Sequence, residues 1–157
     1  MNPEEKKKIL TFALKKISAR DFSEKELLIS LKRKFPETDD FSEIIDILKA
    51  KNYLNDKRFA ENLVKNLRSK KKGIMFIKAK LREKGISESI ISKVLEENSD
   101  ELTLAKEALL KKFGKSSLAK IDKEKLKVKI LRFLISRGFE KSVSFRATEE
   151  FLKSYLL

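Results

Sequence analysis

Apolar residues recur at helical spacing along most of the chain, and strand-like alternation of apolar and polar residues is sustained nowhere. Each stripe places its apolar side chains on one face of a helix, where they can be buried together. The clearest stripes are Phe59-Leu63-Leu67, Ile74-Ile77-Leu81 and Ile90-Ile91-Val94-Leu95. We therefore predict an all-α protein whose core is made of these stripes.

Gly and Pro are scarce and stand where helices are expected to begin or end. Pro36 follows Phe35 and predicts a helix end there, because proline cannot continue a helix and restricts the residue before it. Gly73 is predicted to begin a helix after the Lys70–Lys72 run. The other three glycines each follow an apolar-periodic stretch and are predicted to be left-handed C-caps: Gly85, Gly114 and Gly138.

Helix starts carry their own signals. Ser23 and Glu26 have the spacing of a capping box, and Asp56 is a candidate N-cap. Together these signals predict nine helices, spanning residues 3–18, 23–35, 42–52, 56–69, 73–84, 87–97, 99 or 100–113, 122–137 and 140–157. A polar loop containing Lys115, Ser116 and Ser117 is expected before the eighth helix.

A short pattern repeats at the end of every third predicted helix, starting with the second. It consists of a Leu expected to be buried, a basic residue three positions later and then Gly or an aromatic residue. The three occurrences are Leu31–Phe35, Leu81–Ile86 and Leu134–Phe139. We predict three tandem three-helix units, at residues 1–54, 55–98 and 99–157. Each is too small to bury much core alone, so neighbouring units are expected to pack together.

The amino-acid composition shows that the chain is strongly basic. Hydrophobic residues make up 41% and charged residues 39% of the chain, and the formal net charge is +14. Such an excess indicates a polyanion or an acidic protein surface as partner. The alternative is a solvated charged surface on a lysine-rich protein from a heat-adapted organism.

The charge is concentrated in the second and third predicted units. Residues 65–84 hold nine basic residues against Glu83 alone, whereas the first 55 residues hold 12 basic and 10 acidic residues. A second basic region runs from Lys111 to Arg132. Basic helices joined by a lysine-rich loop can follow a phosphate backbone. The predicted nucleic-acid- and filament-binding residues are Lys65, Arg68, Lys70, Lys71, Lys72, Phe76, Lys78, Lys80 and Arg82.

Phe76 belongs to this set as the aromatic residue among the cations. It lies off the Ile74-Ile77-Leu81 stripe, close to Lys80. It could stack on a base or anchor a protein contact. The alternative is that it packs against the neighbouring unit.

The residue types present exclude several classes of chemistry. The chain has no Cys and no His, so thiol chemistry, thiolate metal sites and imidazole catalysis are ruled out. No phosphate-binding glycine loop or metal-ligand spacing occurs. The acidic pairs Asp39-Asp40 and Glu96-Glu97 suit helix ends and solubility better than catalysis. We expect neither enzymatic activity nor a metal or other cofactor.

No apolar run approaches the roughly 20 residues that cross a bilayer. The apolar segment after Lys6–Lys8 is interrupted by Lys15, Lys16 and Arg20, unlike a signal peptide. With no Cys available for disulfides, the chain suits the cytoplasm. We expect a cytoplasmic monomer without membrane contact.

Several segments together resemble the RecX family of recombination regulators. They are Ser18–Leu27, Asn55–Ala60, the positions Gly73, Ile77, Leu81, Lys84, Gly85 and Ile86, and finally Arg137–Phe139. Their order and spacing match over residues 9–152. The chain departs from the family pattern at Ile74, where Pro is frequent, and at Phe35-Pro36, where Lys-Gly is common. These differences affect local helix geometry.

The resemblance implies a fold and a function. It implies three tandem three-helix repeats in an elongated, curved molecule that binds in the groove of the RecA–DNA filament. It further implies that binding limits filament growth, ATP hydrolysis and strand exchange. We also expect sequence-independent affinity for single- and double-stranded DNA. The alternatives are a helical protein that coats DNA without any recombinase and a helical-repeat adaptor for an acidic protein.

Overall fold

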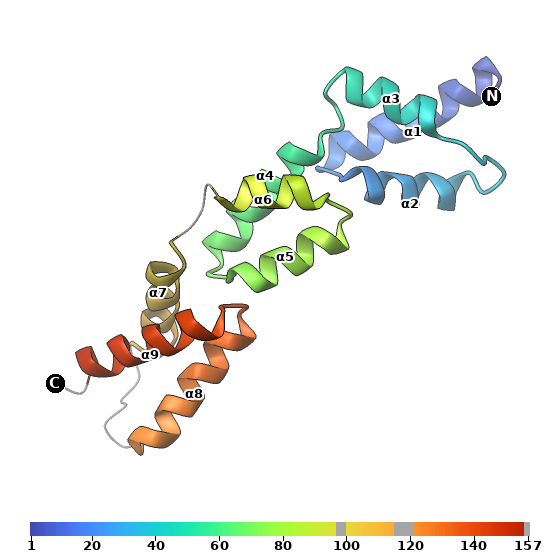
Figure 1. Ribbon diagram of the computed structural model, residues 1–157. Coiled ribbons are helices and arrows are strands. Elements are labelled where there is room, and N and C mark those ends of the chain that lie inside the picture. The colour runs from blue at the N-terminus through green and yellow to red at the C-terminus, as the bar shows by residue number, and fades with distance from the viewer. Residues whose placement is uncertain (97–99, 115–120, 156–157) are drawn as a thin grey trace. The chain divides into compact units, whose positions relative to one another are not determined.

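The computed structural model describes residues 1–96, 100–114 and 121–155. The regular secondary structure of these residues consists of nine helices and no strand (Figure 1). The all-α prediction is confirmed, and the described helix ends lie within two residues of the predicted ones. The helices are α1 (Pro3–Ala19), α2 (Glu24–Lys34), α3 (Ser42–Ala50), α4 (Asp56–Ser69), α5 (Ile74–Glu83), α6 (Glu88–Glu96), α7 (Glu101–Phe113), α8 (Lys123–Ser136) and α9 (Lys141–Tyr155).

Some predicted features fall outside the described residues. They are the predicted helix end at Glu97, the helix start at Ser99, the loop at Lys115, Ser116 and Ser117, and the final two residues. No helix in the described ranges is long and apolar enough to cross a membrane.

The chain divides into two compact units. The first compact unit comprises residues 1–62 and 81–92, and the second comprises residues 63–80 and 93–157. Helices α1–α3 lie wholly in the first unit and α7–α9 wholly in the second, while α4, α5 and α6 each contribute residues to both. The boundaries at 54/55 and 98/99 remain predictions.

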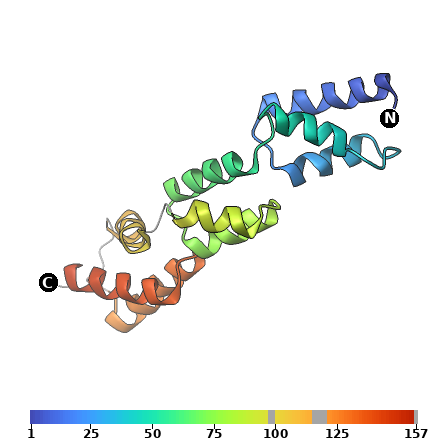
Figure 2. The same cartoon turned by 45° about the horizontal axis from the view of Figure 1, so that its top comes forward.

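In the first compact unit, α1 packs against both α2 and α3 (Figures 1 and 2). Three large side chains at the centre of this packing, Leu27, Leu31 and Ile44, are wholly buried. Burying such a side chain contributes about 1.5–3 kcal/mol. Phe12 meets Phe35 edge to face, with ring centroids 5.5 Å apart. This contact places Phe35 beside the core where α2 ends.

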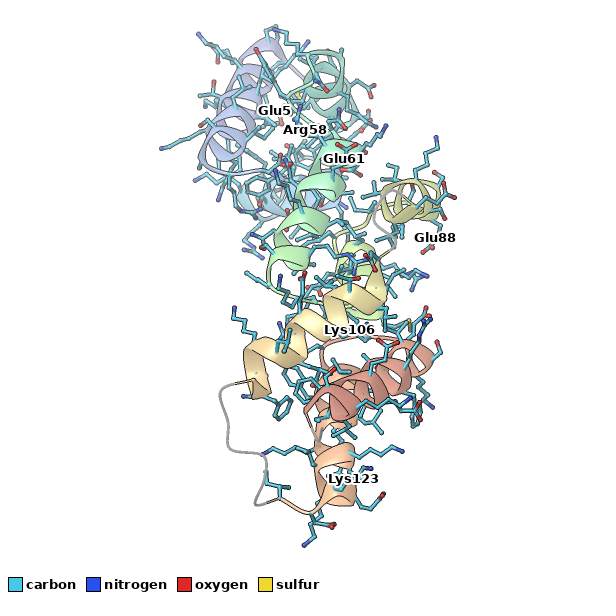
Figure 3. All side chains as sticks on the ribbon, turned by 90° about the vertical axis from the view of Figure 1, so that its left-hand side faces the viewer. Glu5, Arg58, Glu61, Glu88, Lys106 and Lys123 are labelled. Carbon is cyan, nitrogen blue, oxygen red and sulfur yellow. The ribbon has the colours of Figure 1, made fainter. Side chains whose placement is uncertain are left out.

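In the second compact unit, α7 packs against α8 and α9, which also pack against each other. Leu109, Ile130 and Leu134 are wholly buried at the centre of this three-helix core. Phe113 meets Phe133 edge to face at 5.5 Å. Figure 3 shows Lys106 on α7, and this lysine forms an ion pair with Glu150 of α9.

The predicted stripes of α4, α5 and α6 are largely buried. Leu63, Ile74 and Ile90 are only half-buried. The buried members are Phe59, Leu67, Ile77, Leu81, Ile91, Val94 and Leu95. The core prediction for these helices is confirmed at these seven positions.

Four helices end in the same backbone motif. At each C-terminus, two consecutive backbone N–H groups donate to carbonyls of the last helical residues. The first of these two donor residues has a left-handed backbone. In α5, Ile86 donates to Leu81 O and Gly85 donates to Arg82 O, both at 3.0 Å. The residues in the left-handed position are Asn52, Lys71, Gly85 and Gly138, after α3, α4, α5 and α8. The repeated Leu-x-x-basic-Gly pattern therefore encodes a C-cap at Gly85 and Gly138.

Two cap predictions are wrong. Gly114 has helical dihedrals, φ −64° and ψ −21°, so it caps α7 without a left-handed turn. Asp56 does not cap α4, because Asn55 accepts the hydrogen bond from Arg58 N at 3.0 Å. The Asp56 carboxylate instead accepts from Glu24 N in α2 at 2.9 Å. The predicted capping box of Ser23 and Glu26 is confirmed.

Candidate nucleic-acid interface

The Lys70–Lys72 run forms the connection between α4 and α5, and its backbone is fixed. Lys72 N donates to Leu67 O at 3.0 Å, and Lys71 N donates to Arg68 O at 2.9 Å. These bonds place Lys71 in the left-handed region, at φ +59°. Glycine is the usual residue there, since a side chain makes this conformation less favourable.

Arg137, which follows α8, holds this connection from the other side. Its Nε donates to Lys71 O at 3.1 Å, and its Nη2 donates to Lys70 O. The lysine run is therefore held by its own backbone hydrogen bonds and by Arg137 at the end of α8. Its side chains are presented from a defined position.

The N-terminus of α5 has no acidic residue in its first turn. Other parts of the second unit supply its missing acceptors. Gly73 N donates to Arg137 O at 2.8 Å, Met75 N donates to Gly138 O at 2.9 Å, and Ile74 N donates to a Glu101 carboxylate oxygen at 3.2 Å. These bonds satisfy backbone groups that a helix start leaves unpaired.

Gly73 and Gly138 make this close approach possible. A Cβ on Gly73 would lie 2.4 Å from the carbonyl carbon of Gly138. A Cβ on Gly138 would lie 2.4 Å from the Cβ of Phe76. No heavy side-chain atom fits at either position without movement of the neighbouring segment.

Phe76 is half-buried and packs beside Gly138. The ammonium of Lys72 lies 4.5 Å from its ring centroid, and that of Lys80 lies 5.9 Å away. These contacts favour the packing interpretation of Phe76, with cations next to the ring. A part for Phe76 in binding stays a prediction.

The remaining predicted residues differ in what they contact. Arg68 forms an ion pair with Glu101, and both side chains are largely buried. Lys71 pairs with Glu107 at 3.0 Å. Lys65 and Lys70 are exposed, and Lys78 is half-buried. Whether these side chains bind a partner stays a prediction.

Arg82 belongs to the first compact unit. It pairs there with Glu88, with 2.7 Å between Nε and the carboxylate. This hydrogen bond is the main cause of a raised Arg82 pKa. The structure therefore brings Lys70, Lys71, Lys72, Phe76 and Lys80 together in the second unit, whereas Arg82 belongs to the first.

The cations around the lysine run affect one another. The pKa of the Lys72 ammonium lies below its ordinary value, first because of burial and then because of the charges of Arg137 and Lys70. Like charges in proximity disfavour the protonated form. Neighbouring cations therefore contribute to the lowered pKa of Lys72, in addition to burial.

Sequence reasoning did not place Arg137 at the interface. Together with Lys111 and Lys112 it lines a cavity of about 300 Å³ that Lys70 and Lys71 also line. The basic region beginning at Lys111 was a partial signal. In contrast, the sequence marks Arg137 only through a helix-end motif and the RecX-like segment Arg137–Phe139. No group of three or more potential metal-ligating side chains occurs among the residues that the structure describes.

Comparison with known proteins gives a consistent result. The second three-helix domain of RecX matches residues 55–95, and the third matches residues 99–148. The chain is 35% identical over 129 residues to the regulatory protein RecX of Chromohalobacter salexigens, covering 82% of each chain. It is 34% identical over 142 residues to that of Herminiimonas arsenicoxydans, covering 88% of this chain and 91% of the relative.

The fold is also similar to a solved one. The crystal structure of RecX from Lactobacillus salivarius superposes with a TM-score of 0.81 at 25% identity, covering 96% of this chain and 98% of the other. With the matches to the two three-helix domains, this confirms the prediction of tandem three-helix repeats.

Proposed function

Because the chain belongs to the RecX family of regulatory proteins, we propose that it regulates a RecA recombinase. It binds in the groove of the recombinase–DNA filament and limits filament growth, ATP hydrolysis and strand exchange. Family membership, which extends over most of the chain in both sequence and fold, is the observation that carries this proposal.

The charge distribution supports it. A ligand that enters a groove next to DNA phosphates gains from positive charge, and this chain carries +14. The Lys70–Lys72 connection presents cations from a backbone that Arg137 ties in place. A fixed cationic connection loses little conformational freedom on binding.

The decisive measurement is ATP hydrolysis by the recombinase of the same organism on saturating single-stranded DNA. We add this protein well below the recombinase concentration, with an equally basic unrelated protein as control. Inhibition by this protein alone is the expected result. Absence of inhibition together with tight binding to bare DNA would favour the alternative, a helical DNA-coating protein that acts without recombinase.

A triple variant tests the residues. Replacing Lys70, Lys71 and Lys72 with Ala is expected to weaken inhibition and to reduce the salt dependence of binding, with little change in Tm. The backbone carbonyls that Arg137 contacts remain in this variant. The charge-matched control replaces three exposed lysines of α1, namely Lys7, Lys8 and Lys15. Equal inhibition by both variants would contradict a specific part for the connection.

A further inference from the structure

A cationic cavity lies in the second compact unit. Some of the residues that line it are not among the binding residues predicted from the sequence. Its volume is about 300 Å³, at the small end of the range for ligand pockets. Ala108 and Phe133 supply its apolar lining. Five basic side chains supply the rest: Lys70, Lys71, Lys111, Lys112 and Arg137.

These cations come from three helix ends. Lys70 and Lys71 follow α4, Lys111 and Lys112 lie in the last turn of α7, and Arg137 follows α8. A helix C-terminus favours a nearby cation by about 0.3–1 kcal/mol. However, the terminal carbonyls Leu67 O and Leu134 O already accept backbone hydrogen bonds. Among the described residues, Arg137 is the cation of this set that donates to backbone carbonyls, those of Lys70 and Lys71. Capping therefore does not account for the four lysines.

Acidic side chains neutralise little of this charge. None of the seven residues that line the cavity is acidic. Glu107 pairs with Lys71 at 3.0 Å from outside the lining set. The pKa of the adjacent Lys72 is lowered by burial and by the charges of Arg137 and Lys70, which agrees with an excess of positive charge.

The Arg137 guanidinium is held in place by contacts within the second unit. Its Nε and Nη2 donate to the carbonyls of Lys71 and Lys70. Its guanidinium carbon lies 5.6 Å from the ring centroid of Phe133. Among the described residues, no hydrogen bond involves its Nη1. A fixed guanidinium with a remaining donor group is well suited to an anionic oxygen.

We propose that this cavity binds a phosphate group of a nucleic acid strand. Arg137 is the fixed donor, the exposed Lys111 and Lys112 are the counter-charges, and Phe133 is the apolar wall against the adjoining sugar or base. This binding site goes beyond the proposed recombinase contact and does not rest on it, because it can be measured with nucleic acid alone.

The test compares two charge-matched double variants. Lys111→Gln with Lys112→Gln removes two cavity charges and keeps a polar side chain at each position. Lys123→Gln with Lys141→Gln removes two exposed charges of the same unit, at the first residues of α8 and α9. Lys123, labelled in Figure 3, lies at the opposite end of α8 from Arg137. Thermal unfolding of both variants verifies that each is folded.

Binding of a labelled single-stranded oligonucleotide is measured at several salt concentrations. The cavity variant is expected to bind about tenfold more weakly. Its salt slope is expected to fall by about 0.7 for each phosphate that the variant no longer neutralises. The control variant is expected to lose much less affinity. Equal losses in both variants, an unchanged slope in the cavity variant, or no binding by the parent protein would overturn the proposal.

Nuclear magnetic resonance of the Arg137 Nε–H group identifies the source of the phosphate. Inorganic phosphate, ATP and the oligonucleotide are titrated separately into the full chain. A saturable shift of this resonance by the oligonucleotide, absent in the cavity variant, is the expected result. Saturation by ATP at lower concentration would show a free nucleotide site and overturn the strand assignment. No saturable shift with any of the three would overturn the phosphate site itself.

Discussion

The hydroxyl of Ser23 donates a hydrogen bond of 2.7 Å to the backbone carbonyl of Lys84, 61 positions further along the chain. The same oxygen accepts from Glu26 N at 3.2 Å as the N-cap of α2. Lys84 also extends its ammonium to the Glu26 carboxylate at 2.6 Å. Three residues thus connect the start of α2 to the end of α5 within the first compact unit.

Replacing Ser23 with Ala should remove both bonds of this wholly buried hydroxyl. The loss of an N-cap and the unpaired carbonyl of Lys84 together are expected to lower the free energy of unfolding by about 2 kcal/mol. Urea unfolding measures the change. Ser92→Ala, at an exposed position of α6, is the control and should change stability by less than about 0.5 kcal/mol. Equal stability of the two variants would refute the connection.

Glu26 should make stability depend on pH in the acidic range. Burial raises its pKa, but hydrogen bonds from Lys84, Arg20 and the Ser23 backbone together outweigh burial and leave the pKa below its ordinary 4.5. A carboxyl with a lowered folded pKa stabilises the protein above the unfolded value. That stabilisation is lost as the pH falls through the folded pKa.

The variant Glu26→Gln should therefore be less stable than the parent at pH 7. The difference between them should shrink as the pH falls below about 4.5. Chemical unfolding at a series of pH values measures this. Glu61→Gln is the control, because Glu61 is exposed and lies 4.0 Å from Lys57 (Figure 3). A constant difference between parent and Glu26→Gln down to pH 3 would contradict the argument.

Gly138 should not tolerate a side chain. Its φ is +92°, and an added Cβ would lie 2.4 Å from the Cβ of Phe76. Gly138→Ala is expected to lower stability by at least about 2 kcal/mol, from the unfavourable backbone and the displacement of α5. Gly114→Ala is the control, since the helical dihedrals of Gly114 suit alanine. Thermal unfolding distinguishes them, and a similar Tm for both variants would count against the close approach.

Sequence reasoning located the helices because their signals are local. Apolar spacing, Ser23 with Glu26, and the glycines at 85 and 138 all act within a few residues. It failed at Asp56 because Asn55 and Asp56 are both suitable N-cap residues. The structure shows that Asn55 is the cap and that the Asp56 carboxylate instead accepts from the distant Glu24 N–H. Local pattern does not specify contacts made across tens of residues.

The same limit applies to the candidate interface. Charge counting placed the electropositive surface in the segment that contains Lys70–Lys72. It could not show that Arg68 pairs with Glu101, or that Arg137 reaches the carbonyls of Lys70 and Lys71. These pairings depend on how α4, α7 and α8 pack in the second unit. Lys71 likewise gave no sign of its left-handed backbone, because lysine lacks the preference that marks a glycine cap.

Replacing Lys71 with Gly should change stability and oligonucleotide binding in opposite directions. Its φ of +59° is less favourable for lysine than for glycine, so Lys71→Gly is expected to raise stability by about 0.5–1 kcal/mol. The exposed ion pair with Glu107 that this change removes contributes little. The same change removes a cation from the cavity and should weaken oligonucleotide binding.

Lys70→Gly is the control variant. It removes a neighbouring charge at a position without positive φ and should destabilise the protein. Measuring Tm and oligonucleotide affinity for both variants tests this, and a fall in Tm for Lys71→Gly would show that its backbone is not strained.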